Sequence, residues 1–331
     1  MRETGTLHST FSSRSKTVLV SGANGFVGRS LCAELRRQGQ SVRAVARSVN
    51  FQVENIETMS IGTINGETDW TDALRGIKVV IHLAAHVHVM KASVADPQGA
   101  FRKVNVEGTF NLARQAADAG VQRFIFISSI KVNGEFTPLG QPYTAEDRPA
   151  PVDPYGISKL EAEDALRQLA DETGMEVVII RPPLVYGPGV KANFRSMMRW
   201  LETGVPLPLG GIHNKRTLVA LDNLVDLIVT CIDHPAAANQ TFLAGDGEDI
   251  SITELLQRLG IALGKPAKLF PIPVWLLKTG AMLLGKREMA QRLCGSLQAD
   301  ISKASDLLGW RPPVRVDDAL KKTAADFLQK S

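Results

Sequence analysis

Cysteine is scarce in this sequence, and the three that occur, Cys32, Cys231 and Cys294, lie far apart. None of them belongs to a Cys-x-x-Cys pair or lies beside histidines at the spacing of metal ligands. This distribution argues against a disulfide framework and against a zinc site. We therefore expect a cytoplasmic protein, in a reducing compartment, that holds no metal.

Long apolar runs are also absent. A transmembrane helix needs about 18 or more consecutive apolar residues, and the nearest approach, residues 273–284, is interrupted by Lys278 and Gly280. That stretch is more typical of a partly buried helix or a lobe surface than of a segment that touches a membrane. Residues 1–15 are polar and lack the apolar core of a signal peptide, so we expect a disordered tail there and no integral membrane segment.

No run of basic residues stands out, although 38 Lys and Arg against 34 Asp and Glu give a net charge of +4. Because the basic residues are scattered, we expect no nucleic-acid partner. The composition is that of an ordinary globular protein, 44% hydrophobic and 22% charged over 331 residues. That length suffices for two cores, or for one large α/β domain with an appended lobe.

Apolar, β-branched stretches alternate with helical patterns through the first half of the chain. Such alternation predicts βαβ units and a parallel sheet. In open sheets of this kind ligands bind beyond the carboxyl ends of the strands, so the loops that follow the strands are the candidate site. The expected strands are 17–21, 41–46, 78–83, 123–128 and 176–180, and the expected helices are 26–38, 69–75, 97–118 and 154–173.

The first expected strand runs directly into three glycines, Gly22, Gly25 and Gly28. Gly22 permits a tight turn, Gly25 lets backbone amides approach a phosphate, and Gly28 lets the following helix pack against the sheet. The helix N-terminus then favours negative charge. The spacing differs by one residue from the commonest dinucleotide fingerprint, and an ordinary strand–turn–helix corner is the alternative. We predict a dinucleotide pyrophosphate site here.

The composition shifts after Arg181 to loops rich in glycine and proline, which predicts a smaller lobe that closes over the site edge. The expected fold class is α/β: a Rossmann-type, doubly wound parallel sheet with a smaller mixed α/β substrate-binding lobe. Residues 16–182 and 217–246 would form the dinucleotide-binding domain, with 217–245 as one more strand–helix–strand of the sheet. Residues 183–216 and 247–331 would form the lobe.

Tyr155 and Lys159 are four residues apart, which places both on one face of the helix expected there. A tyrosine has a pKa near 10 in water, and an adjacent cation or an oxidised nicotinamide favours its phenolate form. The strand 123–128 ends in Ser128 and Ser129, where a hydroxyl could hold a substrate oxygen against the tyrosine. The alternatives are a solvated helix face and turn-forming serines. The favoured interpretation is an acid–base site for hydride transfer.

Seven short motifs follow one another in a specific order between about Lys16 and Trp310. Together they resemble an extended short-chain dehydrogenase/reductase of the NAD-dependent epimerase/dehydratase family, the group of the nucleotide-sugar epimerases. The motifs are Gly22-x-x-Gly25-x-x-Gly28, His82-Leu-Ala-Ala85, Asn105-Val-Glu-Gly-Thr109, Ser128-Ser129, Tyr155-x-x-x-Lys159, Arg181-Pro-Pro and Tyr186-Gly-Pro-Gly189.

The resemblance implies roles for individual residues. Ser129, Tyr155 and Lys159 would form the catalytic triad, and Asn105 would support the nicotinamide side of the cofactor. Ser129 and Tyr155 would contact the substrate, and Arg216 would lie on its pyrophosphate, with a surface arginine as the alternative. Beyond the resemblance, Asn193 is a candidate phosphate or sugar contact or else a helix cap, and His88 is a candidate substrate contact or else a structural histidine. The expected cofactor-binding residues are Gly22, Gly25, Phe26, Val27, Gly28, Arg47, Leu83, Ala84, Ala85, Asn105, Ser128, Tyr155, Lys159 and Pro182.

Arg47 departs from the pattern of NAD-preferring relatives, which carry an acidic residue at the end of the second strand for the ribose hydroxyls. An arginine there suits a 2′-phosphate. NADP(H) is therefore favoured modestly over NAD(H), although a solvated arginine is the alternative.

The resemblance further implies an NAD(P)-dependent redox step at C4 of a UDP-linked sugar. The strings His82–Val89, Ile130–Gly134 and Arg181–Asn193 are similar to the 4-ketoreductases of UDP-4-keto-6-deoxy-N-acetylhexosamines in surface polysaccharide biosynthesis, which is our first expectation. The alternatives are a 4-epimerase of UDP-glucose or UDP-N-acetylglucosamine, or one acting on a polyprenyl-diphosphate sugar. A non-catalytic dinucleotide sensor is more remote, because Ser129, Tyr155 and Lys159 are all retained. The family also implies a homodimer paired through helices 97–118 and 154–173.

Overall fold

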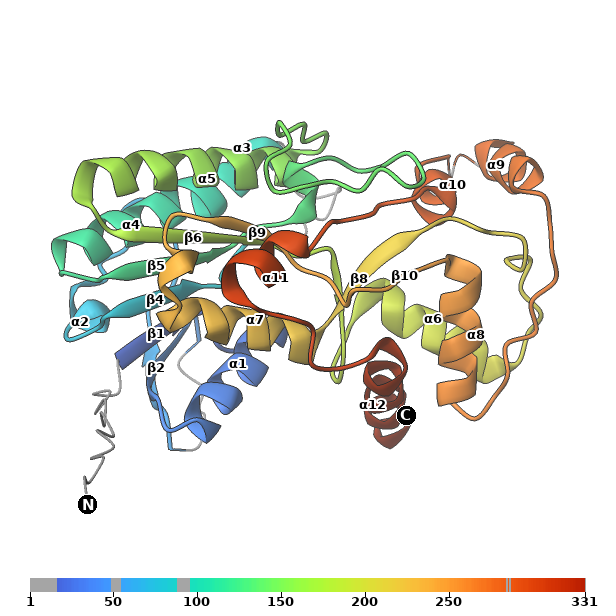
Figure 1. Ribbon diagram of the computed structural model, residues 1–331, viewed down its shortest axis with the longest axis horizontal. Helices are drawn as coiled ribbons and strands as arrows, with labels where there is room; N and C mark the ends of the chain where they lie inside the picture. The colour runs from blue at the N-terminus through green and yellow to red at the C-terminus, as the bar shows by residue number, and fades with distance from the viewer. Residues whose placement is uncertain (1–16, 49–54, 88–95, 284, 286, 331) are drawn as a thin grey trace, which may run out of the picture.

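Two sheets of unequal size organise the chain (Figure 1). The computed structural model describes residues 17–48, 55–87, 96–283, 285 and 287–330. The tail expected at residues 1–15 lies outside them. In the larger sheet the strand order is β3-β2-β1-β4-β5-β6-β9, and every neighbouring pair is parallel. Its strands are Thr17–Ser21 (β1), Ser41–Ala46 (β2), Glu57–Ser60 (β3), Val79–His82 (β4), Arg123–Ile127 (β5), Glu176–Arg181 (β6) and Thr241–Leu243 (β9).

The order of the strands reverses between β1 and β4, because the chain runs outward from β1 to β3 and then returns to the other side of β1. A crevice opens at such a reversal, beyond the carboxyl ends of the two strands. The loops after Ser21 and His82 therefore face one another at the position where an open α/β sheet binds its ligand.

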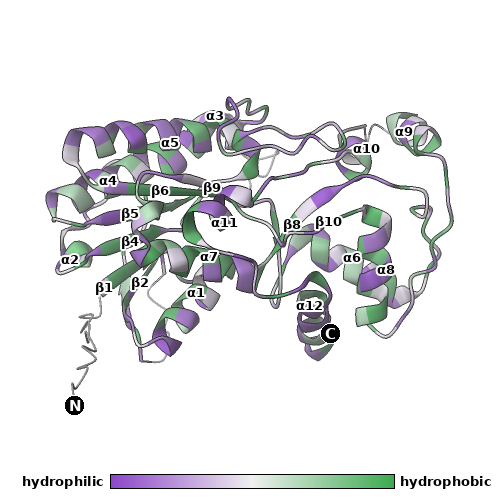
Figure 2. Cartoon of the chain, in the orientation of Figure 1, coloured by the Kyte–Doolittle hydropathy of each residue, from purple (hydrophilic) through white to green (hydrophobic). Residues whose placement is uncertain are grey.

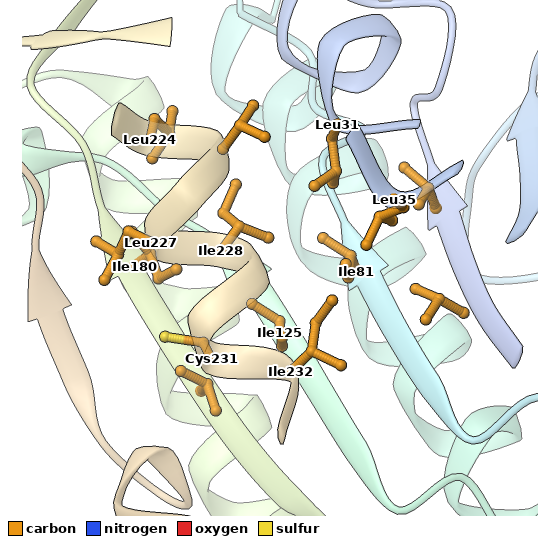
Figure 3. Close-up of a cluster of buried hydrophobic side chains, with 14 of the residues drawn as sticks. Leu31, Leu35, Ile81, Ile125, Ile180, Leu224, Leu227, Ile228, Cys231 and Ile232 are labelled. Atoms are coloured by element: carbon orange, nitrogen blue, oxygen red, sulfur yellow. The ribbon is translucent and has the colours of Figure 1, made fainter. Parts of the chain in front are cut away.

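Helices cover both faces of the larger sheet (Figure 1). On one face lie α1 (Phe26–Arg37) and α7 (Leu221–Asp233), whose buried side chains pack on the strands. Figure 3 shows Leu31 and Leu35 of α1 and Leu227, Ile228 and Ile232 of α7 over the sheet. On the other face, α4 (Thr109–Asp118) and α5 (Pro154–Thr173) form a second core. The central strands are apolar on both faces, as sandwiched parallel strands require (Figure 2).

The smaller lobe is built on a three-stranded mixed sheet in the order β10-β8-β7, formed by Asp249–Ile250, Arg216–Ala220 and Leu184–Tyr186. A separate apolar core lies beneath it. The helices of this part of the chain are α6 (Ala192–Thr203), α8 (Ile252–Ala262), α9 (Val274–Leu283), α10 (Arg287–Cys294) and α12 (Val316–Gln329). Helix α11 (Ser302–Leu308) lies between α10 and α12 in the sequence, but it packs into the core of the larger sheet.

The predicted α/β class with a doubly wound parallel sheet and a smaller mixed lobe is confirmed. One detail was wrong: the expected strand at the start of 217–245 is β8, which pairs in the smaller sheet, while α7 and β9 join the larger one. The segment 97–118 forms α3 (Pro97–Arg102), a π-helical turn at Lys103–Gly108 and α4 rather than one α-helix, and a four-residue helix, α2 (Thr71–Leu74), occupies the segment expected at 69–75. The domain boundaries themselves stay a prediction.

Candidate active site

The glycine turn after β1 is shaped for close approach. Gly22 has φ +70°, and a Cβ there would lie 2.7 Å from the backbone nitrogen of Ala84. A Cβ on Gly28 would lie 2.3 Å from the carbonyl oxygen of Gly22. Gly25 is exposed and caps α1, and no side chain caps that helix. Backbone amides at this N-terminus therefore face the crevice, an arrangement that suits a pyrophosphate.

Phe26 and Val27, the first residues of α1, are half-buried against the core of the larger sheet. They fix the helix so that its N-terminus stays at the sheet edge. Across the crevice, Leu83, Ala84 and Ala85 are half-buried directly after β4. The structure thus brings these five predicted cofactor residues to the two sides of one crevice.

Asn105 connects this crevice to α5. Its amide oxygen accepts a hydrogen bond from the backbone N–H of His86 at 2.7 Å, and its Nδ2 donates to the carbonyl oxygen of His86 and to the hydroxyl of Ser158, each at 3.0 Å. The residue is buried within the π-helical turn, a geometry often found at functional sites. Asn105 therefore sets the position of the loop after β4 relative to the helix that carries Tyr155.

The start of α5 is fixed beside the loop after β5. Asp153 caps the helix by accepting from the backbone N–H of Gly156 at 2.7 Å, and proline occupies the first turn. Lys131 forms an ion pair with Asp153, and its backbone N–H donates to the hydroxyl oxygen of Ser129 at 3.3 Å. Tyr155 follows Asp153 by two residues, so the structure brings the Ser129 and Tyr155 segments together, as the sequence predicts.

Burial governs the titration of both Tyr155 and Lys159. It lowers the pKa of Lys159 to about 7, against the opposing effect of Glu163. Burial, with a smaller contribution from Asp153, raises the pKa of Tyr155 to about 12. The Lys159 ammonium lies 4.1 Å from the centre of the Phe126 ring. At neutral pH the phenol is therefore protonated in this structure, and the role of Lys159 in favouring its phenolate form stays a prediction.

Behind Lys159 lies a buried carboxylate that the sequence reasoning missed. Glu163 is fully buried and accepts hydrogen bonds from Arg181 at 2.6 and 3.0 Å and from Arg167 at 2.8 Å. Ser128, expected at the cofactor, donates its hydroxyl to Glu163 at 2.5 Å and is itself buried. The available signal was the spacing Tyr155, Lys159, Glu163, which repeats every four residues along one helix face.

A second buried polar group, His82, ends β4. Its ring nitrogens lie 2.6 Å from the hydroxyl of Ser21 and 3.0 Å from that of Thr109. Burial, with the nearby charge of Lys159, lowers the pKa of His82 to about 3, so the imidazole is neutral at physiological pH. The residue connects three elements at the edge where the crevice opens.

The remaining predicted residues occupy different places. Arg216 is half-buried, and its guanidinium donates to the carbonyl oxygens of Arg292 and Gly295 at 2.9 and 3.1 Å. Asn193 is exposed in the first turn of α6, whose cap is Lys191. Pro182 is buried, and its carbonyl oxygen accepts from Ile130 at 3.0 Å.

Arg47 is exposed just beyond β2, and His88 lies outside the described residues. Within the described part of the chain, no three or more His, Cys, Asp or Glu side chains gather to hold a metal. Over the same residues, no helix combines the length and the apolar character needed to cross a membrane.

A model of the NAD dependent epimerase/dehydratase family matches residues 18–245. The chain belongs to this family. It is similar to a UDP-glucose 4-epimerase of Vibrio cholerae, with 51% identity over 95% of this chain and 96% of that protein. Among solved structures it resembles the UDP-N-acetylglucosamine 4-epimerase of Bacillus cereus, with a TM-score of 0.78 and 20% identity over 96% and 100% of the two chains. The UDP-glucuronic acid 4-epimerase of Bacillus cereus, in complex with NAD, has a TM-score of 0.77 and 24% identity over 95% and 99%.

Proposed function

We propose that this member of the family is a UDP-sugar 4-epimerase, with UDP-glucose as its first candidate substrate. The observation that carries the proposal is the 51% identity, over nearly the full length of both chains, to a UDP-glucose 4-epimerase. It favours the epimerase, an alternative in our sequence-based interpretation, over the 4-ketoreductase that came first. Surface polysaccharide biosynthesis, tied to the ketoreductase, has no support of its own.

Tyr155 is the proposed acid–base residue. It accepts the proton of the C4 hydroxyl and returns it after the 4-keto sugar has rotated to present its other face. The chemistry that NAD supplies when bound is reversible hydride transfer. Because burial raises the pKa of the phenol to about 12, its ionisation needs positive charge nearby. Lys159, one helical turn away, is the proposed source, and Ser129 is the proposed hydrogen-bond partner of the reacting oxygen.

We propose NAD rather than NADP as the cofactor. The family description names NAD, and the glycine turn, the α1 N-terminus and the loop Leu83–Ala85 offer a cradle for its pyrophosphate. The preference for NADP(H) that Arg47 suggested has no further support, and Arg47 is exposed. An Arg47→Ala variant that binds NAD as well as the parent, measured by calorimetry, would agree with this proposal. A selective loss of NADP affinity from a tight-binding parent would contradict it.

Arg216 is the proposed contact for the substrate diphosphate, because two carbonyl contacts hold its half-buried guanidinium at the start of β8 in the smaller lobe. Asn193 and His88 stay predictions as further contacts. We also propose a homodimer through α3, α4 and α5, whose surface carries the exposed Phe110.

Product analysis tests the proposed reaction. Purified protein is incubated with UDP-glucose without added cofactor, and the sugar nucleotides are separated by chromatography. We expect UDP-galactose to accumulate to a fixed ratio from either side of the equilibrium. Turnover only with a UDP-4-keto-6-deoxy-N-acetylhexosamine and a stoichiometric reduced nicotinamide would instead establish the ketoreductase.

A further inference from the structure

Helix α9 presents an apolar stripe to solvent. None of the residues of Val274–Leu283, all of which the structure describes, is buried. Trp275, Leu276, Met282 and Leu283 are 65%, 44%, 64% and 84% exposed. The other three residues follow Trp275 by one, seven and eight positions, which places the four side chains on one face of the helix. Apolar faces gathered in this way usually mark a contact surface.

The segment of the sequence that leads into this stripe and forms it is basic. From Leu255 to Arg287 the sequence contains no Asp or Glu, while it carries six basic residues. Lys265, Lys268 and Lys278 are exposed, and Phe270, also exposed, adds an aromatic ring between them. A second copy of the chain would bring two such basic segments together with no acidic residue in them to compensate. An anionic surface with an apolar interior matches both properties.

The stripe is linked by structure to the candidate site. α9 packs against α10, and carbonyl oxygens at Arg292 and Gly295, at the end of α10, hold the guanidinium of Arg216. The ring of Phe136 packs on Gly295 from the loop that follows Ser129. A surface seated on α9 would therefore lie beside the part of the lobe that we propose for the substrate diphosphate.

We propose that α9 docks on the headgroup region of an anionic lipid bilayer. Trp275, Leu276, Met282 and Leu283 enter the boundary between headgroups and acyl chains, and the surrounding lysines contact the anionic headgroups. The enzyme is then held at a membrane surface by a peripheral contact.

Vesicle flotation tests this docking with the full-length enzyme. Vesicles of phosphatidylcholine alone are compared with vesicles that contain one quarter phosphatidylglycerol. We expect binding to the anionic vesicles at least about tenfold stronger than to the neutral ones, and a steep weakening with added salt. Equal or no binding to both kinds would overturn the proposal.

Two variants separate the apolar and the charged contributions. Trp275→Ser combined with Leu283→Ser should reduce binding to anionic vesicles at least about tenfold, whereas the matched pair Trp200→Ser and Leu328→Ser, exposed on α6 and α12, should leave it unchanged. Lys278→Glu should weaken binding more than Lys321→Glu, which is exposed on α12. Equal losses in test and control variants would contradict docking through α9.

Two further measurements distinguish membrane docking from a second copy of the chain on α9, and separate its test from the test of the proposed function. Sedimentation without lipid should give the same oligomeric state for the parent and for Trp275→Ser with Leu283→Ser. Loss of an oligomer in that variant, with no vesicle binding by the parent, would show that a second copy covers α9. Epimerase activity on UDP-glucose in lipid-free solution should not change in either variant, so a failure of docking is independent of a failure of the proposed reaction.

Discussion

Helices α5 and α9 distribute polar and apolar side chains in opposite ways. α5 buries charged groups, among them Lys159 at 2% exposure and Glu163 at 0%. α9 exposes apolar groups, among them Trp275 and Leu283. Both arrangements are unfavourable for an isolated helix, because a buried charge loses its hydration and an exposed apolar face orders water.

The two helices differ in where the compensation comes from. Around α5 it lies inside the chain, since Glu163 receives hydrogen bonds from Arg181, Arg167 and Ser128. Around α9 the described residues leave the apolar face exposed, and the bilayer that we propose for it is the source of compensation. Substitutions in α5 should therefore lower the stability or activity of the isolated enzyme. Substitutions in α9 should weaken only its binding to the proposed membrane surface.

The largest effect is expected at Tyr155. Tyr155→Phe removes the hydroxyl proposed to move the proton, and kcat with UDP-glucose should fall by about 10²–10⁴-fold. The phenyl ring keeps its packing against Phe101, so bound NAD, measured by absorbance after denaturation, should be unchanged. Activity close to that of the parent would refute the acid–base role.

Glu163 comes next. Glu163→Ala leaves the buried Arg181 without its carboxylate, and the free energy of unfolding in urea should fall by about 3–5 kcal/mol. The control is Glu172→Ala, which removes an exposed carboxylate on the same helix and should cost less than about 0.5 kcal/mol. Similar losses in the two variants would contradict the contrast between buried and exposed charge.

His82 should make folding sensitive to acid. The unfolded chain takes up a proton on this imidazole near its ordinary pKa of 6.5, whereas the folded chain resists until about pH 3. The group therefore favours unfolding as the pH falls through this window, by about 2 kcal/mol near pH 5. His82→Gln should show a smaller loss of unfolding free energy between pH 7 and pH 5 than the parent, and equal slopes would exclude this origin.

The smallest effect is expected on α9. Leu283→Ala should change the free energy of unfolding by less than about 0.5 kcal/mol, because its side chain has little packing to lose. Leu227→Ala, in the fully buried core beneath α7, should cost about 2–5 kcal/mol. A loss at Leu283 comparable to that at Leu227 would mean that the stripe is covered within the isolated enzyme.

The sequence predicted the elements whose local chemistry is explicit. Asp153-Pro154 marked the start of α5, and four-residue spacing then placed Tyr155 and Lys159 on one face. The strand β3 was missed because Glu57-Thr-Met-Ser60 lacks the apolar pattern of its neighbours and lies at the sheet edge.

The misses at the candidate site depend on contacts between distant segments. Glu163 and Arg181 belong to different elements, and no local pattern indicates that they pair. The Ser128 hydroxyl points to Glu163 and not to the proposed cofactor, because the buried carboxylate of Glu163 accepts its hydrogen bond. The upward shift in the pKa of Tyr155 likewise depends on tertiary burial, which a helix-face argument does not include.

The route of the chain between the two sheets limits how this enzyme can be re-engineered. After β6 the chain crosses to β7 and β8, returns through α7 to β9, leaves again for β10 and α8, and comes back at α11 before ending in α12. A smaller lobe taken from another member of the family would therefore need several matched junctions. Grafting specificity by exchanging single loops or side chains is the more tractable path.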